Sequence, residues 1–159
     1  GFSFELITAK GVPHVEQAAA SLKSSFAKIG VKMKITPVSQ AKMAEKNGQG
    51  TFDAFMRDWL TDYVDDPYYH FFLWWGTGVV INWTGYSNTQ VDEWYQSTAS
   101  FVDDSKRRTP YRNALRQLIK DSPMLWLADG DYTLAVRKDI GGITLHPDTL
   151  LYLRPLKRM

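Results

Sequence analysis

The chain has 159 residues, of which 44% are hydrophobic and 23% charged, so it is long enough to bury a core and close to globular averages. This composition excludes a disordered chain, a collagen-like repeat and a coiled coil. The net charge of +2 offers no electrostatic basis for nucleic-acid binding, and no apolar run approaches the roughly 18 residues that span a bilayer. The absence of cysteine excludes disulfides, thiolate metal sites and cysteine nucleophiles.

The first 37 residues predict a βαβ unit. Apolar side chains alternate from Phe2 to Thr8, as in a partly buried strand. A helix with an apolar stripe should follow, with Pro13 in its first turn and Gly30 at its end. The stripe comprises Val15, Ala18, Ala19, Leu22, Phe26 and Ile29. A second strand over Val31, Met33 and Ile35 should then lie parallel to the first.

The middle of the chain predicts shorter elements. We expect a helix over residues 39–46, a loop over 47–50, a third strand over 52–59 and a helix over 68–75. Farther on, apolar spacing predicts a helix from Asn88 or Thr89 to Phe101.

The last third of the chain predicts one more helix and several extended segments. The helix contains Tyr111, Leu115, Leu118 and Ile119 on its apolar side. Pro110 fits the first turn if Thr109 caps the helix, and kinks the helix if it begins near residue 104. Residues 124–127 and 132–136 resemble strands, and 141–159 an extended tail. The expected fold is one α/β domain over residues 1–159, with a mixed sheet that starts as a parallel βαβ unit and is flanked by helices.

Aromatic residues are concentrated in one segment. Twelve of the 22 fall between Phe52 and Tyr86, where an even distribution would place about five. Those on the third strand and the next helix are expected in the core: Phe52, Phe55, Phe71, Phe72, Trp74 and Trp75. Those in loop contexts are candidates for a ligand wall: Trp59, Tyr63, Trp83 and Tyr86.

The loop after the third strand is the main candidate site, because open α/β sheets bind ligands at the carboxyl ends of their strands. It holds three acids, Asp62, Asp65 and Asp66, next to aromatic residues. Asp66 is expected to cap the helix that starts at Pro67. Asp62 lies too far upstream for that, so a binding role and a structural role both stay open.

Other chemistries have weaker support. Asp62 with Asp65 or Asp66 could form the carboxylate pair of a glycosidase, but nothing in the sequence separates their pKa values. The three histidines, His14, His70 and His146, are isolated, so we expect neither a metal nor a cofactor. The basic run 106–108 is expected to be solvated. The residues alone therefore favour binding over catalysis.

Five stretches in order resemble the C-terminal lobe of the dipeptide, oligopeptide and nickel family (family 5) of extracellular solute-binding proteins of ABC transporters. The two most specific are W-x-x-D-Y-x-x-D-P from Trp59 and N-W-T-G-Y-S-N-x-x-V-D from Asn82. The others are Leu22-x6-Ile29-Gly30-Val31-x-Met33, Gly50-Thr51-Phe52-Asp53-Ala54 and Arg107-x3-Tyr111-x2-Ala114-x3-Leu118-x2-Asp121-x-Pro123.

The resemblance implies one lobe of a two-lobed, type II periplasmic-binding-protein fold, excised from a longer chain. Residues 139–159 would then pack on the missing N-terminal lobe. It also implies a monomeric, non-enzymatic protein at the periplasmic or extracellular face of a bacterial cytoplasmic membrane, which delivers peptides to a membrane permease.

The resemblance also implies a set of ligand-binding residues. Asp62 occupies the position that holds the α-ammonium group of a peptide in the family's peptide binders. Trp59, Tyr63, Asn82 and Trp83 would line the same cleft. Within the family, an oligosaccharide, a nickel chelate or an opine is the alternative solute. A hydrolase that uses Asp62 and Asp65 is the alternative from another class.

Overall fold

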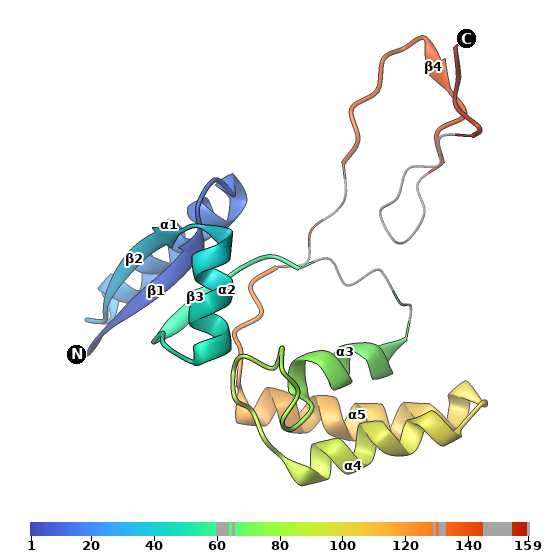
Figure 1. Cartoon of the computed structure of the whole chain (residues 1–159), viewed down its shortest axis with the longest axis horizontal. Coiled ribbons are helices and arrows are strands. Elements are labelled where there is room, and N and C mark those ends of the chain that lie inside the picture. Colours follow the sequence, from blue (N-terminus) through green and yellow to red (C-terminus); the bar gives the residue numbers. More distant parts are fainter. Residues whose placement is uncertain (60–63, 65, 129, 131–132, 145–153, 159) are drawn as a thin grey trace.

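The computed structural model describes residues 1–59, 64, 66–128, 130, 133–144 and 154–158 (Figure 1). Its first part is a sheet unit: β1 (Ser3–Ala9), α1 (Pro13–Lys28), β2 (Lys32–Val38), α2 (Gln40–Gln49) and β3 (Ala54–Met56). Its second part is a helical unit: α3 (Pro67–Trp75), α4 (Thr89–Ser97), the 3-10 helix η1 (Thr98–Ser100) and α5 (Asp104–Asp121). A last short pair, β4 (Ile140–Gly141) and β5 (Lys157–Arg158), lies apart from both units.

The sheet confirms the predicted βαβ unit. The strand order is β2-β1-β3 with both pairings parallel, so the first strand of the chain is the central one. Leu6 packs with residues of α1, whereas Ile7 packs with Met43 of α2. Helices therefore cover both faces of β1. The alternation predicted a partly buried strand, whereas β1 is buried on both faces.

The first helix ends slightly earlier than its apolar stripe predicts. Val15 and Ala19 are buried, as expected, but Ile29 is 72% exposed. Ile29 is the residue that follows the last turn, and Gly30 reverses the chain with a φ of 79°. The Ile29 side chain therefore points away from the sheet.

The elements on either side of Gly50 differ from their predicted lengths. The α2 helix is capped by the Ser39 side chain and continues to Gln49, so the predicted loop over 47–50 is wrong. Gly50 ends it in the left-handed region, at a φ of 65°. The third strand is only three residues long, against the eight predicted, and its pairing with β1 stops at Met56. Phe52 and Trp59 therefore lie outside it.

The helical unit has its own core, formed by α3, α4 and α5. Its buried residues are Phe71, Trp75, Val91, Tyr95, Ala114 and Leu118. The α5 helix begins at Asp104, after the capping side chain of Asp103, and contains Pro110, so the alternative with Thr109 as cap is wrong. Leu115 and Ile119 were expected in the core but are 49% and 59% exposed.

The C-terminal third forms less regular structure than its apolar pattern predicts. Within residues 124–128 and 133–136, no strand is present. The tail carries the antiparallel pairing of β4 with β5, in which Ile140 lies opposite Arg158. Residues 145–153 lie outside the described part of the chain.

Candidate functional site

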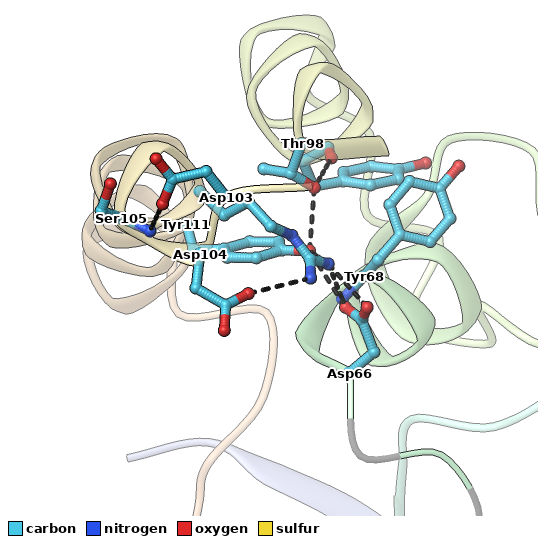
Figure 2. Close-up of polar contacts among 9 residues, drawn as sticks. Asp66, Tyr68, Thr98, Asp103, Asp104, Ser105 and Tyr111 are labelled. Carbon is cyan, nitrogen blue, oxygen red and sulfur yellow. Dashed lines mark hydrogen bonds and ion pairs between the residues drawn. The ribbon is translucent and has the colours of Figure 1, made fainter. Parts of the chain in front are cut away.

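The start of α3 is organised by Asp66, as predicted. Its side chain accepts a hydrogen bond from the Tyr68 amide at 2.8 Å, and Pro67 occupies the first helical position. The same carboxylate accepts hydrogen bonds from Arg107 of α5 at 2.5 and 2.6 Å, and one from the Tyr111 hydroxyl at 3.2 Å (Figure 2). The hydrogen bond from Arg107 is the main cause that holds the pKa of Asp66 below its ordinary value. Asp66 therefore serves the fold.

Arg107 shows that the basic run at the start of α5 is not uniformly solvated. Its side chain is 18% exposed and is held by Asp66, whereas Lys106 and Arg108 are exposed. Arg107 also donates to the Tyr111 hydroxyl, which accepts a further bond from Thr98 of η1 (Figure 2). The prediction that this run is solvated is wrong at Arg107, because helical spacing directs this one position toward α3.

Of the predicted ligand-binding residues, Trp59, Asn82 and Trp83 are described, whereas Asp62 and Tyr63 lie outside the described residues. Asp65, the possible partner of Asp62 in a hydrolase, also lies outside them. The structure therefore tests the surroundings of the predicted anchor rather than the anchor itself.

Trp59 and Trp83 belong to one aromatic cluster. Trp59, three residues after β3, contacts Trp74 of α3 edge to face, with ring centroids 4.7 Å apart. Trp74 in turn contacts Trp83, 6.3 Å away, and Trp83 contacts Phe55 of β3 at 6.0 Å. Trp59 remains 41% exposed. The cluster thus joins the carboxyl end of β3 to α3 and to the loop that contains residue 83.

Arg57 is the member of this cluster that sequence reasoning missed. Its guanidinium carbon lies 4.3 Å from the centroid of the Trp59 ring and 5.1 Å from that of Trp83. Burial lowers the pKa of Arg57, and the nearby Asp58 offsets this only in part. The alternating R-x-W pattern after a strand was the available signal, since it places an arginine beside an indole.

Asn82 uses its amide group within its own loop. It donates hydrogen bonds to the carbonyl oxygens of Gly76 and Tyr86, at 3.1 and 2.8 Å. Its side-chain oxygen accepts a bond from the Thr84 hydroxyl at 2.8 Å. The residue therefore shapes the turn that presents Trp83.

Tyr86, another candidate for the ligand wall, is tied to the helical unit. Its hydroxyl donates to Asp121 at the end of α5 at 2.7 Å, and its ring contacts Trp75. Burial, followed by the bond to Asp121, raises the pKa of Tyr86. Its polar group is committed to a partner within the chain.

Metal ligands do not gather in the described residues, where no three His, Cys, Asp or Glu side chains are placed to hold an ion. His14 lies 2.9 Å from Asp58, and His70 belongs to α3; His146 is outside the described part. Among the helices that the structure describes, none is both long and apolar enough to cross a membrane.

The first half of the chain decides the family. Residues 1–80 match the family model of bacterial extracellular solute-binding proteins, family 5 Middle. The chain belongs to this family. The resemblance predicted from the motifs is thereby confirmed, and the motif from Trp59 lies inside the matched region.

Individual family 5 relatives agree with this assignment. The chain is 28% identical over 138 residues to the probable D,D-dipeptide-binding periplasmic protein DdpA of Escherichia coli, covering 85% of the chain and 27% of that protein. It is 24% identical to the oligopeptide-binding protein AppA of Bacillus subtilis, covering 95% of the chain and 28% of the relative. The chain thus spans less than a third of the length of these family 5 relatives.

A solved structure confirms the predicted fold. The dipeptide binding protein from Pseudoalteromonas sp. SM9913, in complex with Met-Leu, superposes on the whole chain with a TM-score of 0.84 and 22% identity. The match covers 32% of that protein. The chain therefore has the mixed α/β fold of one lobe of a type II periplasmic binding protein.

Proposed function

We propose that residues 1–159 form the C-terminal lobe of a peptide-binding protein that serves an ABC importer. The observation that carries the proposal is the family 5 match together with relatives named for dipeptide and oligopeptide binding. The aromatic cluster at the carboxyl end of β3 supports a ligand site in the same place as the predicted loop.

In this proposal Asp62 neutralises the α-ammonium group of the bound peptide. A charge removed from water needs a partner of opposite sign, because an unpaired buried charge is strongly penalised. Trp59, Tyr63 and Trp83 form the wall of the site, and Asn82 holds the turn that carries Trp83. Main-chain groups and water would meet the peptide backbone, so that many side chains are accepted.

Transport follows from closure of two lobes over the ligand. A bound peptide stabilises the closed state by its higher affinity for that state, and the closed monomer docks on a membrane permease. The protein would act at the periplasmic or extracellular face of the cytoplasmic membrane, without catalysis. Residues 139–159 would pack on the N-terminal lobe. A lone lobe offers only part of the contacts, so the 159-residue chain by itself should not bind tri-alanine saturably at low micromolar concentration.

A non-peptide solute is the second candidate, favoured by the exposed face of Trp59, because flat indole rings stack well on sugars. In the hydrolase alternative, Asp66 is not available as the second carboxylate, since it is paired with Arg107. The relatives named above are also binding proteins rather than enzymes.

The substitution Asp62→Asn in the complete protein that carries this chain tests the proposal. Isothermal titration with tri-alanine should show a loss of about 2–5 kcal/mol, with the melting temperature unchanged. N-acetyl-tri-alanine, which lacks the ammonium group, should bind the unaltered protein equally poorly.

A matched control is Asp58→Asn. Asp58 precedes Asp62 by four residues, and its exposed carboxylate is paired with His14. It should leave tri-alanine affinity unchanged. If Asp62→Asn binds tri-alanine as well as the unaltered protein, the peptide assignment fails. A sugar binder would be insensitive to the change, and a hydrolase would lose turnover.

A further inference from the structure

We infer that the outer side of α5 docks on an anionic lipid bilayer, through a row of four cations beside two exposed apolar side chains. The cations are Arg108, Arg112, Arg116 and Lys120, and the apolar pair is Leu115 and Ile119. These six residues are called the basic face below. The inference goes beyond the proposed function and rests on it in one respect, the location of the protein at the outer face of a membrane.

The first argument is the distribution of charge along α5. Residues 105–120 contain six Lys or Arg side chains and no Asp or Glu, in a chain whose net charge is only +2. Arg107 is turned inward and paired with Asp66. The four cations of the basic face are exposed and recur at every fourth position, so that they form one row along the helix. At 1.5 Å per residue, this row is about 18 Å long.

The second argument is that the row has no partners of opposite charge and works against the stability of its own helix. None of its four side chains takes part in an ion pair with any residue that the structure describes. Like charges four positions apart on a helix repel one another. A surface that served solubility alone would mix charges of both signs and avoid this repulsion. An anionic surface facing the row would relieve it.

The third argument is the apolar pair beside the row. Leu115 and Ile119 are 49% and 59% exposed. Helical spacing places Ile119 on the same side of α5 as Arg112 and Arg116. This mixture of cations and large aliphatic side chains is typical of helices that lie on an anionic bilayer, where the cations meet phosphates and the apolar groups enter the boundary with the acyl chains.

The fourth argument favours a lipid surface over an acidic protein. A guanidinium that recognises a carboxylate at a fixed position gains most when it is held in one geometry, as Arg107 is by Asp66 and Tyr111. Within the described part of the chain, no ion pair holds the cations of the basic face in this way. Side chains without such support can follow the headgroups of a fluid bilayer, which attracts each cation by its charge alone.

Cosedimentation of the complete protein with lipid vesicles tests the inference. Vesicles that contain anionic phosphatidylglycerol should bind the protein, whereas vesicles of phosphatidylcholine alone should not. Raising NaCl from about 0.1 M to about 1 M should abolish binding, because the Debye length falls from about 10 to about 3 Å. The double variant Arg112→Gln with Arg116→Gln should bind about 30-fold more weakly, since each cation near an anionic surface contributes about fivefold.

Matched variants separate the basic face from general charge effects. Lys23→Gln with Lys28→Gln removes two exposed cations of α1 and should leave vesicle binding unchanged. Arg112→Lys with Arg116→Lys should bind as the unaltered protein does, because a lipid surface responds to charge more than to guanidinium geometry. Ile119→Ser should weaken binding about three- to tenfold.

Two further measurements keep the outcomes distinct. The melting temperature of the double glutamine variant should be unchanged or higher, since a repulsion is removed, so its weaker binding does not reflect unfolding. Its affinity for tri-alanine should equal that of the unaltered protein. Failure of the unaltered protein to bind anionic vesicles, or equal weakening by the α1 variant, would overturn the docking surface and leave the peptide function standing. Loss of binding in the lysine variant would indicate a partner with fixed geometry and would also overturn it. Vesicle binding without tri-alanine binding would overturn only the peptide function.

Discussion

Arg107 and Asp66 are 41 positions apart in the sequence, yet one guanidinium nitrogen of Arg107 donates to both carboxylate oxygens of Asp66, at 2.5 and 2.6 Å. The contact joins the first turn of α3 to the first turns of α5. Asp66 also accepts a hydrogen bond from the Tyr68 amide, so a single carboxylate caps α3 and binds the side chain of Arg107 in α5.

Removing this carboxylate should destabilise the helical unit. Asp66→Ala eliminates the cap of α3 and leaves the largely buried Arg107 with only the more distant carboxylate of Asp104, 3.6 Å from its Nη1, as an ion-pair partner. We expect a loss of about 2–3 kcal/mol, less than for a fully buried pair, because the Asp66 side chain is 35% exposed. Urea unfolding at pH 7 measures it. The control Asp103→Ala removes an exposed cap of α5 and should cost less. Equal losses would contradict the role of the ion pair.

The same carboxylate should contribute to acid sensitivity. Its pKa is lowered in the folded protein, mainly by the Arg107 hydrogen bond, so its stabilisation is present above the ordinary aspartate value of 3.8 and is lost as pH falls through the folded value. The free energy of unfolding should fall below about pH 4, and less steeply in Asp66→Asn. Asp103 and Asp121, whose pKa values are also lowered, leave a residual slope. Parallel slopes in both proteins would refute this assignment.

Gly76 and Gly48 should respond in opposite directions to alanine. A Cβ at Gly76 would lie 2.6 Å from the Phe72 carbonyl oxygen and 2.9 Å from the Tyr95 hydroxyl, whereas one at Gly48, inside α2, meets nothing within 4 Å. We expect Gly76→Ala to cost about 1–3 kcal/mol and Gly48→Ala to stabilise by about 0.5–1 kcal/mol. Thermal unfolding followed by circular dichroism compares the two. An unchanged stability of Gly76→Ala would contradict this expectation and show that the end of α3 can shift to accommodate the added methyl group.

Asn82→Ala should affect stability more than ligand binding. The variant removes three hydrogen bonds within one turn, for an expected loss of about 1–3 kcal/mol in the free energy of unfolding. Asn113→Ala is the control, since Asn113 has no side-chain hydrogen bond in the described part of the chain. Calorimetry and tri-alanine titration should be combined. Unchanged stability with lost affinity would instead place the Asn82 amide on the ligand.

Local patterns predicted the sheet unit well. The alternation from Phe2, the apolar stripe of α1 and the turn at Gly30 are short-range signals, and the parallel pairing follows from their order. The prediction of buried residues failed where an apolar residue could lie on either the buried or the exposed side of a helix. Leu115 and Ile119 are apolar at helical spacing, but packing against α3 and α4 buries Leu118, as predicted, together with Ala114 in their place.

The candidate site was predictable only in part. The cap by Asp66 followed from its residue type and its position before Pro67. Arg57 and Arg107 did not, because both acquire their role from partners brought in by the fold: an indole 26 residues away for Arg57, and a carboxylate 41 residues away for Arg107. The role of Asp62 stays a prediction.

The outer strand β2 carries a proline, Pro37, which pairs in register with Thr8. The carbonyl of Val38 accepts a bond from Lys10 of the loop after β1, and backbone directions alternate along a strand, so the nitrogen of Pro37 faces away from β1. A strand docking there would find one donor missing. The missing donor is thus a built-in obstacle to edge-to-edge pairing of β2 with the same strand of a second copy of this chain.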